Sequence, residues 1–488
     1  STSIINYLGV LLGVVNVLWL QTAIISELQI GILNYVVDIS IILLPLILFG
    51  TSGVSARFIH IFKEGNEKNG FLNLLLLLPI VIISLVFIIC VFFQNEIITF
   101  LGKEVVEYKK YLVYIFPLLF TNAYQFLLEA ILATKSLTVF STFLKYIFRR
   151  LVLIGLLIIF HYNLIDFYQL LSLYVLAHFL EIFMLFIFFK NQLKFKFCLP
   201  KLAATPEKKK EIIMYALFLI LTTGGVFMIG KIDTIMISSI VGDFKQLGVY
   251  AVAFFIASII EVPKRIVHQL VIPIMSVMVT ENRNKEFVEM FQQTGINMAI
   301  FSILIFMNVW YSIDELFLLI PNGDIYRSGK WVIFFIGLSK VIDVVFGTTD
   351  IAINVTKHYK WNGILAPFLI FLTFFTNYLF IHYYGIVGAA IGTLVTVFTY
   401  FFIKYIIVII KLRMNLLSKK YIGIVLTSLL VMFIFMLKPN IFDNHFLEIV
   451  SNSILITFIF IGGNYLLKSS KEMNQLIDNS WNKYIRKT

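Results

Sequence analysis

The sequence predicts an all-α integral membrane protein with about 14 transmembrane helices. Its 488 residues are 60% hydrophobic with a mean hydropathy of +0.94, whereas soluble domains are roughly half apolar. Apolar runs of the roughly 20 residues that a helix needs to span a bilayer recur from end to end. The segments between them are too short for a soluble domain, and basic residues gather in alternate loops.

The apolar runs define fourteen spans. The first span lacks the basic flank and the small-residue cleavage site of a secretory signal, so we expect it to stay in the membrane. The predicted centres lie near residues 12, 46, 82, 121, 151, 178, 224, 261, 300, 341, 371, 396, 429 and 457.

Lysine and arginine indicate the orientation, because basic residues in short loops stay on the cytoplasmic side. When alternate loops are assigned to opposite sides, one side carries 28 of the 39 basic residues and the other carries 7. Both termini fall on the basic side and are predicted to be cytoplasmic. The loop bias accounts for most of the net charge of +12, so we expect contact with anionic lipid headgroups and not with nucleic acid.

The chain contains an internal repeat. Residues 29–45 (QIGILNYVVDISIILLP) match residues 246–263 (QLGVYAVAFFIASIIEVP), and residues 131–140 (ILATKSLTVF) resemble residues 353–362 (INVTKHYKWN) at a similar offset. Six spans separate the copies, so both enter the membrane in the same orientation, related by an axis along the membrane normal. Parallel repeats of this kind occur in secondary transporters, whose substrate sites lie between the repeats.

The repeat predicts two six-helix lobes followed by two additional helices. A basic segment with two prolines lies between the lobes and is expected to run along the cytoplasmic surface. The predicted boundaries are residues 1–190 for the N-lobe, 191–211 for the linker, 212–411 for the C-lobe, and 412–488 for the last two spans with a cytoplasmic tail.

Charged residues within spans are the candidates for a functional site, because an ionised group at mid-bilayer costs about 2.5 to 3.5 kcal/mol on insertion scales. Lys231 and Asp233 in the seventh span are two residues apart and point to different sides of a helix. Each therefore needs its own partner or a hydrated cavity. Adjacent Arg149 and Arg150 lie near the middle of the fifth span, which favours a functional role.

The eighth span carries a charged face. Glu261, Lys264, Arg265 and His268 fall at i, i+3, i+4 and i+7, which places them on one side of a helix. The equivalent positions of the first copy of the repeat are uncharged, so the repeat itself does not require these charges. The structural alternatives are a Glu261–Lys264 bridge and a core histidine at His268.

The tenth span carries a similar stripe, in which Lys340 and Asp343 are spaced to form a local bridge. Asp350 lies farther along the same stripe, nearer the cytoplasmic end. The structural alternative is snorkelling, in which a long side chain reaches the membrane surface. It applies to Arg57, Glu129, Lys231 and Asp350.

The inward-facing set has an excess of positive charge, which suits an anionic substrate, and arginine binds phosphate oxygens bidentately. The predicted substrate-binding residues are Arg149, Arg150, Lys231, Lys264, Arg265 and Lys340. The predicted coupling or charge-balancing residues are Asp233, Glu261, His268 and Asp343. The sequence contains no P-loop, no G-x-S-x-G and no His/Cys metal spacing, so we predict neither an enzyme nor a metal site nor a cofactor.

Two stretches resemble the multidrug/oligosaccharidyl-lipid/polysaccharide (MOP) exporter superfamily, and within it the polysaccharide transporter branch of Wzx-type flippases. In residues 231–255 (KIDTIMISSIVGDFKQLGVYAVAFF), an Asp in the seventh span is followed by a G-x-Y-x-x-A turn. Residues 384–398 (YGIVGAAIGTLVTVF) are similar to the Gly/Ala-rich start of the family's twelfth span. The resemblance covers nearly the whole chain.

The resemblance implies two lobes that alternate between inward-open and outward-open states in a bacterial inner membrane. The implied cargo is a polyprenyl-pyrophosphate-linked oligosaccharide, a repeat unit of O-antigen, capsule or exopolysaccharide, moved from the cytoplasmic to the periplasmic leaflet. The six cations would bind its pyrophosphate, and Na⁺ or H⁺ is the candidate coupling ion. The implied partners are this lipid-linked oligosaccharide, membrane lipids, and a glycan polymerase with its chain-length partner.

Two relatives of this activity remain alternatives. A lipid II-type flippase also has two extra C-terminal spans, but the first span here, STSIINYLGVLLGVVNVLWL, lacks that branch's arginines. A cation-coupled multidrug exporter would carry an acidic residue in that span and net negative charge in its cleft. A membrane-embedded glycan polymerase is disfavoured, because the external loops are short.

Overall fold

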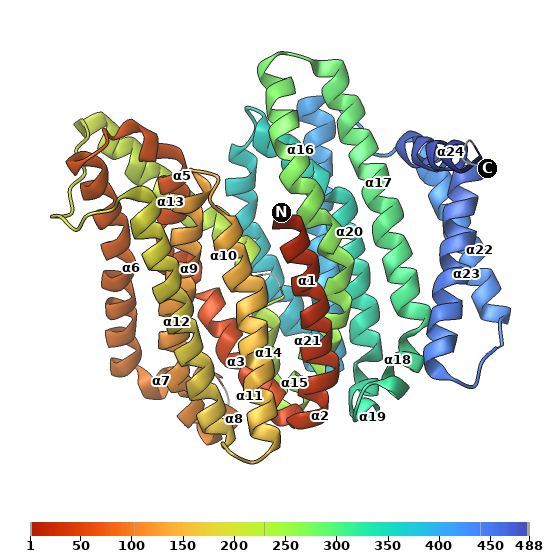
Figure 1. The fold of residues 1–488 in the computed structure, drawn as a ribbon, viewed down its shortest axis with the longest axis horizontal. Coiled ribbons are helices and arrows are strands. Elements are labelled where there is room, and N and C mark those ends of the chain that lie inside the picture. The colour runs from red at the N-terminus through yellow and green to blue at the C-terminus, as the bar shows by residue number, and fades with distance from the viewer. Residues whose placement is uncertain (1, 102, 229, 440, 486–488) are drawn as a thin grey trace. The chain divides into compact units, whose positions relative to one another are not determined.

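The structure is a computed structural model that describes residues 2–101, 103–228, 230–439 and 441–485. Among these residues every regular element is a helix, which confirms the predicted fold class (Figure 1). The chain divides into two compact units. The first unit comprises Ser1–Ala251 with Gly363–Ala389, and the second comprises Val252–Asn362 with Ala390–Thr488. The lobe and linker boundaries expected from the repeat remain predictions.

The first unit contains the helices of the N-terminal half and part of α21. They are α1 (Thr2–Val14), η1 (Val15–Gln21), α2 (Thr22–Ile24), α3 (Glu27–Ile42), α4 (Leu44–Leu48), α5 (Thr51–Phe58), η2 (Ile59–Ile61), α6 (Asn66–Phe92), α7 (Gln94–Leu101), α8 (Lys103–Glu107), η3 (Lys109–Tyr114), α9 (Ile115–Ala133), α10 (Val139–Phe143), η4 (Leu144–Phe148), α11 (Arg149–His161), α12 (Phe167–Leu193), α13 (Pro206–Met228), α14 (Ile232–Ile240) and the first half of α15 (Phe244–Ser258). Helices α10, η4 and α11 follow one another without interruption and form one helical run.

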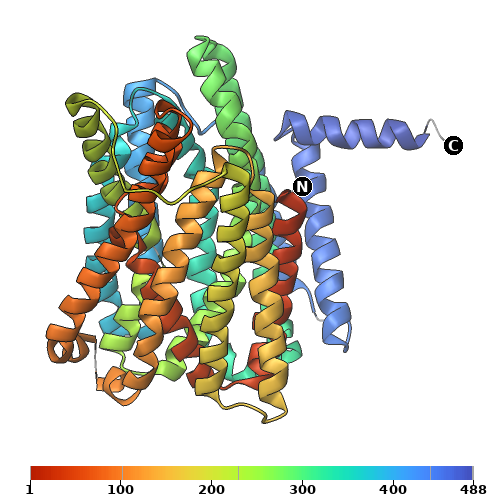
Figure 2. The same ribbon diagram turned by 60° about the vertical axis from the view of Figure 1, so that its left-hand side comes forward.

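The second unit begins within α15 and contains the remaining elements. They are η5 (Ile259–Glu261), α16 (Val262–Thr280), α17 (Asn284–Tyr311), α18 (Ile313–Leu319), α19 (Gly323–Tyr326), η6 (Arg327–Gly329), α20 (Lys330–Val355), the ends of α21 (Lys360–Ile407), η7 (Val408–Leu412), α22 (Lys420–Leu437), α23 (His445–Leu466) and α24 (Lys471–Ile485). Helix α24 runs across the direction of α22 and α23 (Figure 2).

Eleven segments of the described chain are long and apolar enough to cross a membrane. One of them, Lys360–Leu412, has 53 residues, and Gly385 interrupts its helix with a φ of 55° and a ψ of −133°, so this segment is long enough for two spans. Residues 139–161 and Pro206–Met228 form further helical runs of spanning length that carry charged residues. Together these segments account for the fourteen predicted spans, so the chain is a multi-pass membrane protein.

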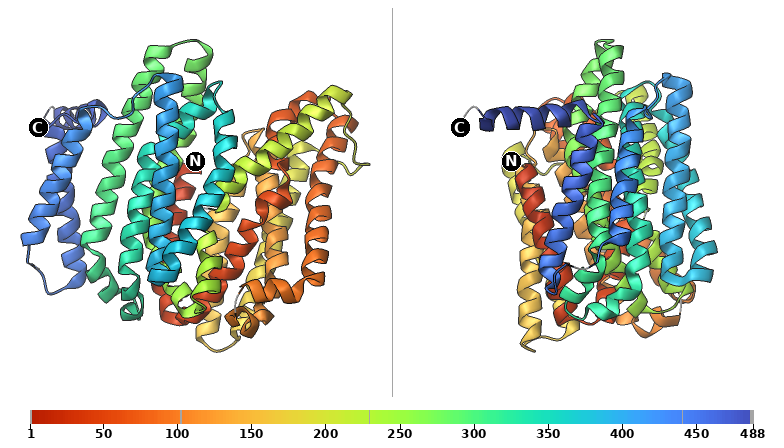
Figure 3. Two further views of the ribbon diagram at one scale, coloured as in Figure 1. Left: turned by 180° about the vertical axis from the view of Figure 1, so that it is seen from behind. Right: turned by 90° about the vertical axis from the view of Figure 1, so that its right-hand side faces the viewer.

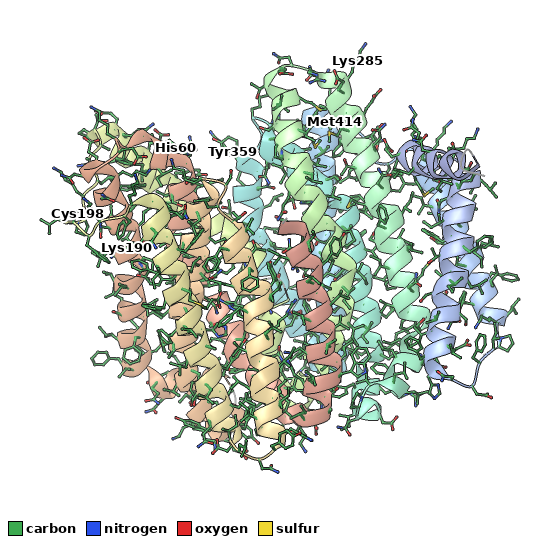
Figure 4. All side chains as sticks on the ribbon, in the orientation of Figure 1. His60, Lys190, Cys198, Lys285, Tyr359 and Met414 are labelled. Carbon is green, nitrogen blue, oxygen red and sulfur yellow. The ribbon has the colours of Figure 1, made fainter. Side chains whose placement is uncertain are left out.

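Some residues from loops predicted to share a side can be located within each unit. His60, Lys190 and Cys198 lie at one end of the first unit, and Lys285, Tyr359 and Met414 lie at one end of the second, where α24 also lies (Figure 4). The 28 residues counted on the basic side include some that lie inside spans: Lys404 lies inside α21 with 2% of its surface exposed, and Arg149 and Arg150 lie in the middle of the helical run 139–161.

The two copies of the repeat meet where α3 crosses α15. A Cβ atom on Gly31 would lie 2.0 Å from the carbonyl oxygen of Phe244, and a Cβ on Gly248 would lie 1.9 Å from that of Glu27. Each carbonyl belongs to the residue four positions before the opposite glycine, so the contact is reciprocal. Gly31 and Gly248 are the glycines of the two matching Q-x-G sequences. The sequence repeat therefore corresponds to a local two-fold relation between helices.

Candidate functional site

Lys231 lies at a break in the seventh span. Helix α13 ends at Met228, Gly230 adopts a φ of 71°, and α14 begins at Ile232. The Lys231 ammonium donates to Asp38 Oδ1 on α3 at 2.5 Å. Thr234 Oγ1 donates to the other oxygen of the same carboxylate at 2.7 Å. Asp38 is 6% exposed, so the lysine neutralises a carboxylate that is buried between helices.

Asp233 has a separate set of partners. Its carboxylate is fully buried and accepts hydrogen bonds from the Tyr250 hydroxyl on α15 and, at 2.6 Å, from Asn377 Nδ2 on α21. Lys231 and Asp233 thus form hydrogen bonds with different side chains, as their spacing on a helix predicts. The two residues instead connect α14 to three different helices of the first unit.

Arg149 lies at the start of α11 and contacts a polar cluster of the first unit. Its Nε donates to Glu181 on α12, and its Nη1 donates to Asn122 on α9 at 3.2 Å. Asn122 in turn donates to Ser40 on α3 at 3.1 Å. Glu181 is fully buried. Arg149 Nη2 and Glu181 Oε1 are buried and have no hydrogen-bond partner among the described residues, so each retains hydrogen-bonding capacity for a ligand or water.

Arg150, its neighbour, lies against α1. A Cβ on Gly13 would come within 2.9 Å of the Arg150 guanidinium carbon, and a Cβ on Gly9 within 3.1 Å of its Nη1. Asn16 donates to the Arg150 carbonyl at 3.4 Å. The small residues of α1 thus leave room for this side chain. The adjacent arginines point toward different helices, so the structure does not bring them together as one site.

In the second unit, two ion pairs join α20 to α16 and to η5, the turn directly before α16. Lys340 donates to Glu261 at 2.6 Å, and Lys264 donates to Asp343 at 2.6 Å. Arg265 donates to the other oxygen of Glu261. The expected bridges between Lys340 and Asp343 and between Glu261 and Lys264 are wrong. Parallel packing of the two charged faces gives Lys264 and Lys340 each a partner on the opposite helix, which competes with pairing along their own helices.

Farther along the same faces, Lys404 of α21 donates to Asp350 of α20. Its ammonium lies 4.0 Å from the centre of the Tyr400 ring. Snorkelling does not describe Asp350, because its partner is buried. His268 lies beside this cluster, since a Cβ on Gly347 would lie 3.3 Å from Lys264 Nζ and 3.5 Å from His268 Cε1. His268 Nε2 is buried without a hydrogen-bond partner among the described residues.

Sequence reasoning missed Asp38, Glu181 and Lys404. The signal for the two acids was the one used for Asp233: a charged residue within an apolar span. When these three residues and Asp350 are added to the predicted set, the set contains seven cations and six carboxylates. The predicted excess of positive charge is therefore small, and the sign of the charge does not separate an anion site from a cation site.

The geometry provides polar contacts within spans and little that resembles a reaction centre. No group of three or more metal-ligating side chains occurs in the part of the chain that the structure describes. A buried carboxylate such as Asp233, which accepts hydrogen bonds from Tyr250 and Asn377, is the type of group that can exchange a proton or a monovalent cation. Paired charges across helices can be broken and remade when helices move.

The fold is shared with solved structures of membrane transporters. The chain is similar to the lipid II flippase MurJ in an inward closed conformation, with 17% identity, a TM-score of 0.74, and 94% of this chain and 97% of that chain covered. It is also similar to an inward-facing multidrug resistance MATE family transporter of the MOP superfamily (17% identity, TM-score 0.60, 83% and 98% covered). A third similar structure is the MATE multidrug transporter DinF-BH (16% identity, TM-score 0.61, 86% and 96% covered).

Residues 1–279 match the sequence model of the polysaccharide biosynthesis protein family. The match covers more than half of the chain, which therefore belongs to this family. Comparison with curated proteins gives no match. The family and the fold together support the predicted MOP superfamily membership, and the Wzx-type branch is consistent with both.

Proposed function

We propose that this protein is a flippase that moves a polyprenyl-pyrophosphate-linked oligosaccharide from the cytoplasmic to the periplasmic leaflet of a bacterial inner membrane. The observation that carries the proposal is the combination of a polysaccharide biosynthesis family match with the fold of a lipid-linked-sugar flippase. Both termini would be cytoplasmic, as the basic loops indicate. A glycan polymerase and its chain-length partner would use the product.

Transport of this kind addresses a specific physical barrier. A sugar that crosses hydrocarbon loses its hydrogen bonds to water at a cost of several kcal/mol for each polar group. Helices lined with paired charges and buried amides offer substitute hydrogen bonds. Alternating access would expose them to one side of the membrane and then to the other, while the prenyl tail stays in lipid.

Within this proposal Arg149 is the principal pyrophosphate ligand. Glu181 and Asn122 hold its guanidinium and leave Nη2 as a buried donor. An anionic headgroup would satisfy this donor, and a guanidinium binds phosphate in a forked geometry. The other proposed pyrophosphate ligands are Arg150, Lys231, Lys264, Arg265 and Lys340.

Coupling is assigned to the acids and the histidine. Asp233 is the first candidate for binding Na⁺ or H⁺, since its carboxylate is fully buried within a span and accepts hydrogen bonds from Tyr250 and Asn377. The other proposed coupling or charge-balancing residues are Glu261, His268 and Asp343. Glu261 and Asp343 are paired with lysines, which favours charge balance over ion binding for these two.

A ligand-stabilisation assay tests the substrate class. The purified protein is heated with a polyprenyl-pyrophosphate oligosaccharide, with lipid II, or with a lipophilic drug cation. A ligand at about 100 times its Kd stabilises the folded state by about 2.7 kcal/mol. We expect stabilisation by the oligosaccharide lipid. Stabilisation by lipid II instead would assign the lipid II branch, and stabilisation by the cation alone would assign the multidrug exporter, which the MATE-like fold and the near balance of charges keep as the second candidate.

Variants then test the position of the pyrophosphate. Arg149→Lys retains the positive charge opposite Glu181 but loses the guanidinium that binds phosphate in a bidentate geometry. This variant should therefore fold and lose most of the stabilisation by the ligand. Arg283→Lys is the matched control, because Arg283 lies between α16 and α17, outside the clusters, with its side chain 44% exposed. Equal stabilisation of both variants would contradict the role of Arg149.

A further inference from the structure

Helix α24 is amphipathic and follows directly after the last membrane span. Taken at helical spacing, Met473, Ile477, Trp481 and Tyr484 fall on one side of α24. The opposite side contains only polar residues, Lys471, Gln475, Asn479 and Asn482, and Asn474 and Asp478 lie at the border between the two sides. A helix with this pattern buries its apolar side against protein or against the boundary between lipid headgroups and acyl chains.

Specific contacts hold the turn between α23 and α24. Lys468 adopts a φ of 50°, and Ser469 and Ser470 are each 1% exposed. Ser470 Oγ hydrogen-bonds to Asn297 of α17 at 2.6 Å. A Cβ on Gly423 of α22 would lie 2.4 Å from Ser469 Oγ, so only glycine leaves room for this bend.

Two hydrogen bonds from α23 set the rotation of α24 about its own axis. Asn474 Nδ2 donates to the Tyr465 carbonyl at 2.9 Å, and the Tyr465 hydroxyl donates to Asp478 at 2.6 Å. Met473 packs against the hydrophobic core formed by α17, α20, α22 and α23. The side of α24 that begins with Met473 therefore faces the spans, and the polar side faces away from the membrane.

The helix is longer than the structure beneath it. These contacts come from its first two turns, and the rest of the helix extends past α22 and α23 (Figures 2 and 3). On the apolar side, the later positions Trp481 and Tyr484 fall in the extended part. Because α23 ends as a membrane span immediately before α24, the space below the extended part is at the level of the bilayer surface.

Charge defines the type of lipid. The segment 468–487 contains five basic residues and two acids. Both acids are engaged with the protein, Asp478 with Tyr465 and Glu472 with Ser470, while Lys468 and Lys471 are exposed. Each basic residue near an anionic membrane surface shifts the binding equilibrium by about fivefold.

We propose that α24 is a docking surface for anionic lipid headgroups and lies in the bilayer interface beside the last two spans. Its first turns fix its direction, and its apolar side inserts below the headgroups. Its basic residues bind the phosphates of anionic lipids. The proposal is independent of the transported substrate, because it depends only on the membrane position of α23.

Site-directed spin labelling of the full-length protein tests the proposal. Cys90 and Cys198 are replaced by serine, and a nitroxide is attached at Tyr484→Cys or at its matched control Asn482→Cys, which lies on the opposite side of the helix. Collisions with oxygen, which concentrates in lipid, are compared with collisions with a water-soluble nickel chelate. The protein is reconstituted in phosphatidylcholine vesicles with and without phosphatidylglycerol.

We expect the label at position 484 to meet mainly oxygen and the label at 482 mainly nickel in the anionic vesicles. The nickel contact at 484 should rise several-fold without phosphatidylglycerol. Lys483→Glu should raise it in the anionic vesicles as well, whereas Lys285→Glu, in a different loop, should not. Nickel contact at both positions, or protection from both reagents at 484, would overturn the membrane docking. Equal results in the two lipid mixtures would overturn the anionic preference.

Discussion

Asp38 is buried between helices and depends on Lys231 for its charge balance. The two side chains differ in exposure: Asp38 has 9% of its side chain exposed, and Lys231 has 31%. Removing one partner of a buried pair leaves a charge that is costly in proportion to its burial. The pair therefore predicts an asymmetric response to mutation.

Lys231→Met should lower the free energy of unfolding by about 3 kcal/mol, because it strands the buried carboxylate of Asp38. Asp38→Leu should cost about 1 kcal/mol, because the stranded lysine can extend toward water. The double variant should be more stable than Lys231→Met alone. Unfolding in detergent, measured for all three variants, checks this cycle. Simple addition of the two single effects would contradict direct coupling of the pair.

The same residues show what sequence can provide for the site. Lys231 and Asp233 stand out by composition alone, and their need for separate partners follows from helical geometry. The partners themselves are distant in the sequence. Asp38 lies 193 positions from Lys231, and Glu181 lies on α12, the helix after the one that carries Arg149. Local spacing favoured a Lys340–Asp343 bridge, but in the structure Lys340 pairs with Glu261 and Asp343 pairs with Lys264. Partners across helices depend on packing, which a single sequence does not encode locally.

At the scale of helices, the crossing of α3 and α15 requires glycine on both sides. Gly31→Ala would place a methyl group 2.0 Å from the Phe244 carbonyl oxygen and push the helices apart. Overpacking of this kind costs about 1 to 3 kcal/mol. Gly155→Ala in α11 is the matched control, because its Cβ would meet no described atom within 4 Å and alanine favours a helix. Thermal unfolding should separate the two variants, and equal stability would refute the close crossing.

The loop between α22 and α23 depends on one buried acid. Glu448 is fully buried and accepts hydrogen bonds from Lys438 and from the backbone N–H groups of Ile441 and Phe442. Glu448→Ala should release the loop and increase its proteolysis and hydrogen exchange several-fold. Glu448→Gln should have a smaller effect, because the amide oxygen still accepts from the backbone. Unchanged proteolysis in the alanine variant would show that other contacts hold the loop.

At the scale of the whole molecule, hydropathy was sufficient to predict the fold class and the number of spans. Individual boundaries were harder to predict. The seventh span is interrupted before Ile232, and the eleventh and twelfth are joined through Gly385 without a polar loop. Both features depend on backbone geometry at glycines, which composition does not specify. The repeat aligned Gly31 with Gly248, but the crossing at which these two glycines meet follows only from the structure.

The proposed transport also predicts a response to membrane potential. A negative-inside potential favours outward movement of a pyrophosphate headgroup with two negative charges. The gain is about 4.6 kcal/mol per 100 mV if both charges cross the full field. Flipping in proteoliposomes should therefore accelerate under a negative-inside potassium diffusion potential at equal Na⁺ and H⁺ on both sides. Asp233→Asn retains hydrogen-bonding capacity without the charge, so it should remove any dependence on a Na⁺ or H⁺ gradient and keep the response to potential. If the potential has no effect while an ion gradient drives flipping, the headgroup must cross with compensating cations, and coupling would then be the main role of the buried acids.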